Sequence, residues 1–540
     1  MQKTLTYAAV VLLLSLLVVC SCIPIYTDEL VWHSILARVF DDGLLSYTKI
    51  PECTSARFIE IPALLVPGRL LASVLYYKIS PPYLLRGIAI VVNLFSVCLA
   101  CYVIKRFQLA APDEASRGSL LPRIFFVMAI TAGISPAWRA TARPEALFSI
   151  VLIGTVLMAN IFHDRRATVG TVVLYTLLGL CVFSLHPKGL FFLPLILYAA
   201  VMLRVDGRPL IIKGLCCCTI VIAAAQSVNY YSGLYDCPNA PLIKQVIGQH
   251  MLNPKIAREA PFEYVAALFS NVIHVSRYAR AIVAPTGSVY WGWLPPHDHG
   301  LFEYLWPTSV YVIFCLLGAV VLCGVIGCLS EIGKTRALTM RTGIPLALLV
   351  CELGLTAHQS NVNQYDGVFH IGMLGFTAAL LMPFCSWLPF TFFSRMLTLS
   401  IVCGAVSIAS FVAAYYPLVA RIYTYEIKGN FPLPFHSGIQ LYNYSQVRQR
   451  LWKLLKQCNI DLSKVNGILV DDSSYPYAQH SLRPVHTMGT TWFTEPGSNQ
   501  YQVLQEAGIE AVIASCNSLK PEVVERSRTL EGYCCTVIDK

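Results

Sequence analysis

The stretch that decides the fold is LLRGIAIVVNLFSVCLACYVI, residues 84–104, in which Arg86 is the only charged side chain. A helix of about 20 apolar residues is long enough to cross the hydrocarbon core of a bilayer. Ten further apolar runs lie at 5–23, 122–138, 145–163, 168–185, 188–203, 210–229, 306–329, 343–358, 367–388 and 396–416. The sequence therefore predicts an α-helical polytopic membrane protein with about 11 transmembrane helices.

The composition supports this fold class. Of the 540 residues, 56% are apolar and 13% are charged, whereas a soluble domain carries about 25% charged residues. The net charge of +10 is of the sign that nucleic acid attracts, but the basic residues lie between the apolar runs, where they set orientation. The composition excludes an ordinary soluble or disordered protein, and we expect no nucleic-acid partner.

The basic residues also predict the orientation. If the N-terminus is cytoplasmic, the short loops placed inside carry about 14 Lys and Arg residues and those placed outside carry about three. The first run, 5–23, lacks an Ala-x-Ala cleavage site, so we expect it to remain as the first span. An odd number of spans then puts the C-terminus outside the inner (plasma) membrane.

Three large segments fall on the outer side in this arrangement, at 24–83, 230–305 and 417–540. Residues 60–79 are apolar but interrupted by Pro67, Gly68 and Arg69, and we expect a helix lying in the outer interface there. The C-terminal segment alternates predicted helices and strands, at 446–457, 467–470, 500–507, 511–514 and 534–538. The sequence thus predicts a transmembrane domain, 1–416, and a small extracytoplasmic α/β domain, 417–540.

Most of the 20 cysteines lie in apolar runs, where cysteine acts as a small hydrophobe. In the C-terminal segment, predicted strands bring Cys516 near Cys534 and Cys535, and an oxidising compartment permits a disulfide. We therefore expect Cys516 to pair with Cys534 or with Cys535. None of the cysteines in polar segments shows the CxxC spacing of a zinc site; these are Cys53, Cys237, Cys458, Cys516, Cys534 and Cys535.

An acidic pair, Asp28 and Glu29, follows the first apolar run directly. One interpretation is that Thr27 caps a helix whose positive N-terminus the two carboxylates favour. The other is that a carboxylate at the membrane surface takes a proton as a general base. Position alone slightly favours the first interpretation.

Two short outer turns carry basic residues, although Lys and Arg generally prefer the cytoplasmic loops. Arg139 and Arg143 are four residues apart between the third and fourth spans, and are predicted to share a helix face as a fork for an anionic group such as phosphate. His186 and Lys188 follow the fifth span. The alternative is that these side chains anchor span ends at the interface, with Glu145 neutralising one arginine.

Three ionisable residues lie in or beside later spans: Glu352, His358 and His370. Such groups are costly at membrane depth, so they are candidates for lining a cavity. The loop residues His297 and His299, with Asp298 between them, form a weak ligand set, and we predict no metal site from them. The sequence has no Walker A, GxGxxG or GxSxG motif, so an ATP-driven pump or a serine hydrolase has no support.

Together, the acidic pair after the first span, Arg143-Pro144-Glu145 after the third, and His186-Pro187 with Gly189 after the fifth resemble bacterial GT-C glycosyltransferases. This class includes protein O-mannosyltransferases and aminoarabinose transferases, and the resemblance covers residues 5–416. It implies a polyprenyl-phosphate-linked sugar donor, transfer on the outer side of the membrane with inversion, and a glycan, lipid or protein acceptor.

By position, the resemblance implies that Asp28 is the base with Glu29 beside it. It implies that Arg143 and Lys188, with Arg139 and His186, hold the donor phosphate. The sequence contains no Asp-x-Asp, which argues against a nucleotide-sugar mechanism and leaves dependence on a divalent metal ion open.

Two other functions remain open at this point. In a secondary transporter, Glu352, His370 and the arginines would line a solute path. A non-enzymatic assembly or sensor protein would bind its ligand through the C-terminal domain. Charges concentrated at one membrane level favour a reaction at the surface over a transport path.

Overall fold

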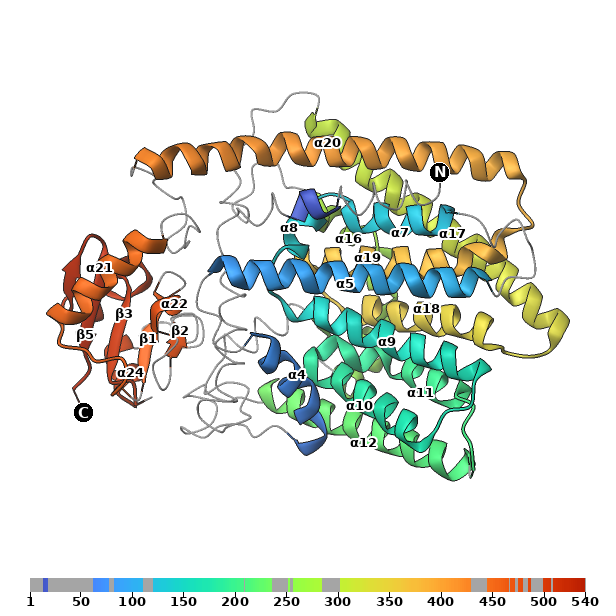
Figure 1. The fold of residues 1–540 in the computed structure, drawn as a ribbon, viewed down its shortest axis with the longest axis horizontal. Helices are drawn as coiled ribbons and strands as arrows, with labels where there is room; N and C mark the ends of the chain where they lie inside the picture. The colour runs from blue at the N-terminus through green and yellow to red at the C-terminus, as the bar shows by residue number, and fades with distance from the viewer. Residues whose placement is uncertain are drawn as a thin grey trace.

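The structure is a computed structural model that describes residues 13–17, 62–76, 82–109, 120–207, 209–235, 251–252, 256–283, 302–428, 444–465, 467–471, 474–478, 484–486, 499–506 and 508–539. Most of these residues form a bundle of helices, and a small α/β unit lies beyond one end of that bundle (Figure 1). Six described helices are long and apolar enough to cross a membrane: Leu84–Leu109, Pro144–Asp164, Pro209–Asn229, Tyr304–Thr335, Met340–His358 and Gln364–Cys385. The chain is a helical membrane protein.

Helices cover all ten predicted runs between residues 84 and 416. They are α5 (Pro82–Leu109), α7 (Leu121–Thr131), α8 (Ser135–Arg139), α9 (Pro144–Asp164), α10 (Val169–Leu185), η2 (Pro187–Phe192), α11 (Leu193–Met202), α12 (Pro209–Tyr235), α17 (Phe302–Thr335), α18 (Met340–His358), α19 (Gln364–Leu381) and α20 (Phe390–Lys428). The helical fold class is confirmed. The total of about 11 spans stays a prediction, because only residues 13–17 of the first run are described.

Helix α19 is the centre of the bundle, since every residue from Asp366 to Leu381 is buried. It packs against α7, α17 and α16 (Arg277–Ile282). Gly372 and Gly375 lie where an added Cβ would collide with Arg139 and Ala129. These glycines let neighbouring helices approach α19 closely, as small residues do between membrane helices.

The predicted span 122–138 is not one helix. Gly133 has φ +58°, a conformation that glycine adopts without strain, and the Ile134 amide donates to the Ile282 carbonyl at 3.0 Å. The run therefore forms α7 and α8, with a change of direction between them.

The same break corrects a second expectation, that Arg139 and Arg143 share a helix face. Helix α8 ends at Arg139, and Arg143 is extended, with φ −115° and ψ 155°, because Pro144 follows it. The two arginines therefore do not form an i, i+4 pair on one helix.

Residues 62–76 form a short 3-10 turn, η1 (Ala63–Leu65), and helix α4 (Val66–Tyr76). Pro67 and Gly68, which we expected to interrupt the helix, lie inside it. Proline is tolerated in a first helical turn, and Gly68 lies against α10, where an added Cβ would come 2.9 Å from the Cys181 carbonyl oxygen. Helix α4 packs on α10 and buries Arg69 and Ser73.

The C-terminal unit contains a five-stranded sheet of order β2-β1-β3-β5-β4. Strand β1 pairs in parallel with β2 and β3, and β5 pairs antiparallel with β3 and β4. The elements are α21 (Tyr444–Gln457), β1 (Ile468–Val470), α22 (Tyr475–Ala478), β2 (Pro484–His486), α24 (Gln500–Glu506), β3 (Ala511–Ser515), η5 (Cys516–Ser518), α25 (Pro521–Val524), β4 (Arg528–Leu530) and β5 (Tyr533–Val537). The three predicted strands and two predicted helices of this segment are confirmed.

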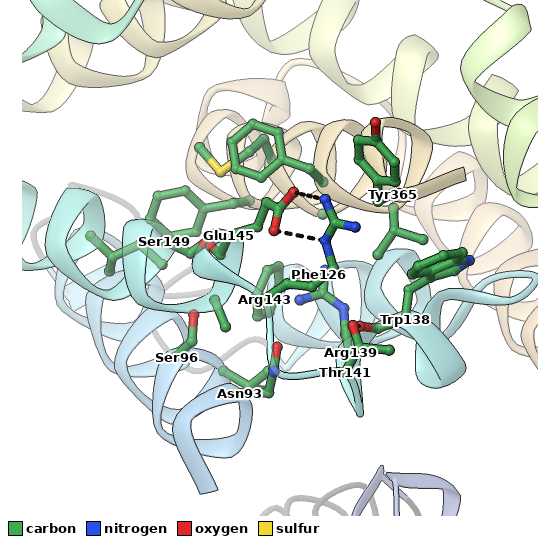
Figure 2. Close-up of a pocket in the computed structure, with 18 residues that line it drawn as sticks. Asn93, Ser96, Phe126, Trp138, Arg139, Thr141, Arg143, Glu145, Ser149 and Tyr365 are labelled. Atoms are coloured by element: carbon green, nitrogen blue, oxygen red, sulfur yellow. Dashed lines mark hydrogen bonds and ion pairs between the residues drawn. The ribbon is translucent and has the colours of Figure 1, made fainter. Parts of the chain in front are cut away.

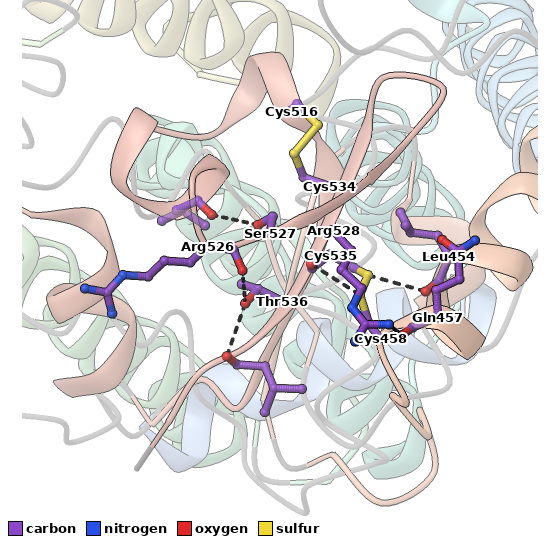
Figure 3. Close-up of a disulfide and its surroundings, with 12 residues drawn as sticks. Leu454, Gln457, Cys458, Cys516, Arg526, Ser527, Arg528, Cys534, Cys535 and Thr536 are labelled. Carbon is purple, nitrogen blue, oxygen red and sulfur yellow. Dashed lines mark hydrogen bonds between the residues drawn. A yellow bond between two sulfur atoms is a disulfide. The ribbon is translucent and has the colours of Figure 1, made fainter.

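Two disulfides close this unit, on opposite sides of β5 (Figure 3). Adjacent residues on a strand point to opposite faces. Accordingly Cys534 pairs with Cys516, while Cys535 pairs with Cys458 at the end of α21. The expected pairing of Cys516 is confirmed with Cys534 as its partner, and Cys458 is a partner that the sequence did not predict.

Candidate functional site

Arg143 and Lys188 meet at the first turn of α19, where they contact Tyr365 and Asp366. Arg139 lies further along α19, against Gly372. Lys188 is held in place by the turn after α10, in which its backbone amide donates to His186 Nδ1 at 3.1 Å. Gly189 makes this turn possible, because an added Cβ would lie 2.8 Å from the Val182 carbonyl carbon. The motif that begins with His186-Pro187 therefore requires glycine at position 189, because any side chain there would collide with Val182.

Arg143 is held by Glu145. Its Nε and Nη2 donate to the two carboxylate oxygens at 3.1 and 3.0 Å, the bidentate geometry in which arginine binds carboxylates most strongly. Its guanidinium also lies over the ring of Tyr365, 4.0 Å from the centroid, a cation–π contact. Glu145 thus neutralises Arg143 and fixes its direction.

His186 is neutral in this setting. Burial, with the nearby positive charge of Lys188, lowers the pKa of His186 from 6.5 to about 3. Because Nδ1 accepts the Lys188 amide, the proton belongs on Nε2, which lies 3.7 Å from Glu145 Oε1. His186 therefore connects the Arg143–Glu145 pair to the Lys188 turn without adding charge.

Lys188 pairs with Asp366 across the bundle. The Lys188 Nζ lies 2.5 Å from Asp366 Oδ1, and the two side chains are 7% and 4% exposed. The other carboxylate oxygen accepts the Asn363 amide at 3.1 Å in the capping box that begins α19. Asp366 therefore joins the start of the central helix to the turn after α10.

Arg139 differs from the other two cations. No hydrogen bond or ion pair joins its guanidinium to another residue in the described part of the chain, and its Nε is buried without a partner. Burial lowers the pKa of Arg139 to about 10, which keeps it protonated at neutral pH. Among the described residues, Glu145 neutralises Arg143 and Asp366 neutralises Lys188, whereas Arg139 has no carboxylate partner.

Arg139 and Arg143 line the same pocket, a cavity of about 60 Å³ (Figure 2). Helix α5 contributes Asn93 and Ser96, and α9 contributes Ser149. The apolar part of the wall comes from α5, α7, α9 and α19: Val97, Phe126, Ile153, Val368, Phe369, Met373 and Phe376. The pocket is therefore cationic where α8 meets α9 and apolar toward the interior of the bundle.

The remaining predicted site residues lie elsewhere. Asp28 and Glu29 fall outside the described residues, as do His297, Asp298 and His299. Glu352, His358 and His370 do not line this pocket. Glu352 accepts a hydrogen bond from Thr377 Oγ1 at 2.7 Å, and His358 lies near Phe191, with 5.1 Å between ring centroids. His370 stacks on Tyr278, with centroids 3.9 Å apart.

Sequence reasoning missed Asp366 and Tyr365, because the stretch 359–366 reads as a solvated turn. The signal that was present is the Asn-x-x-Asp spacing of Asn363 and Asp366, which begins a helix as a capping box. Within the described ranges, no group of three His, Cys, Asp or Glu residues is arranged to hold a metal ion.

No protein-family model and no curated protein sequence matches the chain. Among solved structures, the chain is similar to ArnT from Cupriavidus metallidurans bound to undecaprenyl phosphate. The TM-score is 0.43 at 13% identity, over 99% of this chain and 97% of that one. It is also similar to the archaeal oligosaccharyltransferase AglB from Archaeoglobus fulgidus in complex with an inhibitory peptide and a dolichol-phosphate, with TM-score 0.43 at 9% identity over 94% of this chain and 69% of that one.

Both of these proteins belong to the GT-C superfamily, the class that the sequence motifs resemble.

Proposed function

We propose that the chain is a membrane glycosyltransferase that moves a sugar from a polyprenyl-phosphate donor to an extracytoplasmic acceptor, with inversion. The observation that carries this proposal is Arg139, a cation without a carboxylate partner in the described chain, which lines a pocket together with Arg143. Arg139 is half-buried, and a charge removed in part from water without a partner is costly. An anionic ligand group at this pocket offsets that cost.

The chemistry fits a phosphate leaving group. When the bond between the anomeric carbon and the phosphate oxygen breaks, the oxygen keeps the electron pair and the phosphate gains negative charge. Cations that are already in place stabilise this charge more in the transition state than in the ground state. We assign the direct phosphate contact to Arg139 and Arg143. Lys188 and His186 do not line the pocket, and we assign them a supporting role at this end of the donor site, through Asp366 and Glu145.

The acceptor hydroxyl attacks the anomeric carbon and must lose its proton. We assign Asp28 as the base that takes this proton, with Glu29 as a supporting carboxylate. Glu145 and Asp366 are poorly suited to that role, because each already pairs with a cation. The acceptor is a glycan, a lipid or a protein.

The two disulfides of the C-terminal unit support its placement outside the cytoplasm, since disulfides persist in oxidising compartments. We therefore place the chain in the inner (plasma) membrane, with its N-terminus cytoplasmic and the domain 417–540 outside. The residues that suggested a transporter, Glu352 and His370, contact Thr377 and Tyr278, so no specific observation favours a solute path.

The test is a transfer assay with the full-length chain in proteoliposomes. A panel of polyprenyl-phosphate donors with radiolabelled sugars is supplied with extracts of envelope glycans, lipids and proteins as acceptors. Covalent transfer of label from a lipid-linked donor, and not from a nucleotide sugar, is expected. Uptake of a free solute without covalent transfer from any donor would overturn the proposal.

A further inference from the structure

Helix α15 (Pro261–Ile273) carries a stripe of exposed apolar side chains that a membrane-spanning role does not explain. Phe262, Val265, Phe269 and Ile273 are 89%, 61%, 68% and 60% exposed. Their spacing of three, four and four residues puts them on one face of the helix. A helix of 13 residues is about 20 Å long, too short to cross a bilayer of about 30 Å.

The opposite face of α15 lies across the end of α18. Asn271 Nδ2 donates to the Ala357 carbonyl at 2.8 Å, and the Tyr264 ring lies 6.0 Å from that of His358. Tyr264 and Asn271 are about 10 Å apart along α15, yet they contact adjacent residues of α18. Helix α15 therefore crosses α18, a candidate membrane span, instead of running alongside it.

Arg277 fixes this crossing. Its guanidinium donates to the carbonyls of Thr356 and Ser360 at 3.0 and 3.1 Å, to the carbonyl of Gln359, and to Asn271 Oδ1 at 3.1 Å. These acceptors include the end of α18, where backbone carbonyls lack helical partners. The orientation of α15 relative to the span is therefore held by a charged, multiply bonded side chain.

A third face of α15 is polar and exposed, formed by Glu263, Ser270 and His274. Exposed arginines lie just before and just after the helix, at Arg258 and Arg280. Helix α15 thus has one half-buried face against α18, one exposed apolar face and one polar edge, and arginines flank it. This is the pattern of charge and apolar residues that a segment at the surface of an anionic bilayer shows.

We infer that α15 lies in the membrane interface, with Phe262, Val265, Phe269 and Ile273 inserted at the boundary between headgroups and acyl chains. The occupant of this face is the bilayer, with anionic lipid headgroups at Arg258 and Arg280. This inference is independent of the proposed transfer reaction. It makes α15 a membrane contact that Arg277 connects to the turn before α19.

The experiment places the photocrosslinking residue p-benzoylphenylalanine at Phe262 or at Phe269 in the full-length chain. The purified variants are reconstituted in vesicles of phosphatidylethanolamine and phosphatidylglycerol, irradiated, and examined by intact mass and peptide mapping. Ser270 is the matched control on the polar edge of the same helix. Val350 of α18, 58% exposed on a candidate span, is the control for a lipid-facing site.

Phospholipid adducts at Phe262 and Phe269 with yields comparable to that at Val350, and several-fold above that at Ser270, are expected. Crosslinks from Phe262 or Phe269 to another segment of the chain would overturn the inference, because that segment would then cover the stripe. Adduct yields no higher than at Ser270 would also overturn it. Monodisperse elution of each variant confirms that the chain has folded.

Discussion

Lys188 Nζ lies 2.5 Å from Asp366 Oδ1, so the turn after α10 and the first turn of the central helix are joined by a buried ion pair. Asp366 also accepts the Asn363 amide that begins α19. The pair therefore fixes the position of the cationic end of the pocket relative to α19. Its loss is expected to weaken both the stability of the fold and ligand binding.

Asp366→Asn keeps an oxygen for the Asn363 amide but removes the charge opposite Lys188. Since breaking a buried pair leaves an uncompensated charge, we expect a loss of about 3 kcal/mol or more. The double variant Lys188→Met with Asp366→Asn removes both charges, keeps the acceptor for the Asn363 amide, and is expected to recover most of this stability. Thermal unfolding followed by tryptophan fluorescence measures both. If Asp366→Asn is as stable as the unmodified chain, the ion pair does not stabilise the fold.

Gly189→Ala tests whether the turn after α10 requires a residue without a side chain at position 189. The added Cβ would lie 2.8 Å from the Val182 carbonyl carbon, so the turn must shift, at a cost of about 1–3 kcal/mol, and Lys188 moves with it. Gly87→Ala in α5 is the matched control, because an added Cβ there meets nothing within 4 Å. It is expected to gain about 0.5–1 kcal/mol. Similar melting temperatures for the two variants would contradict the account.

The neutral state of His186 predicts a pH dependence of stability. Its pKa is about 3 in the folded chain against an ordinary value of 6.5, so the unfolded chain binds the proton more readily. Stability is therefore expected to rise with pH from about 3 to about 6.5 and to level off above that. In His186→Asn the rise should be smaller. Melting curves between about pH 4.5 and 7.5 decide it, and parallel curves for both proteins would argue against a neutral, buried imidazole.

The two disulfides predict a domain that depends on oxidation. The bonds join Cys516 to Cys534 and Cys458 to Cys535, across sequence separations of 18 and 77 residues. Loop-closure entropy predicts contributions of about 3 and about 4.5 kcal/mol. Peptide mapping of the full-length chain without reductant should find both pairs, and reduction should unfold the C-terminal domain first. Free thiols at all four positions would refute the pairing and weaken the placement outside the cytoplasm.

The helices and the main strands could be predicted from the sequence because apolar runs and their periodicity are local. The apolar run of α5 and the run that forms β3 needed no tertiary information. The role of Asp366 could not be predicted in this way, because its partner Lys188 is far away in the sequence. The direction of Arg143 was predicted wrongly, since Pro144 overrides the helical spacing from Arg139. That Arg139 has no carboxylate partner among the described residues is likewise a tertiary property.

The central claim, that the end of the pocket with Arg139 binds a lipid phosphate, is tested most directly by native mass spectrometry. The full-length chain is titrated with undecaprenyl phosphate and, in parallel, with undecaprenol, which lacks the phosphate. Arg139→Gln is compared with Arg166→Gln, whose arginine is 75% exposed and pairs with Asp206 at 3.4 Å. We expect preference for the phosphate form, and affinity about tenfold or more weaker in Arg139→Gln alone. Equal binding of both lipids, or an unchanged affinity in Arg139→Gln, would contradict the account.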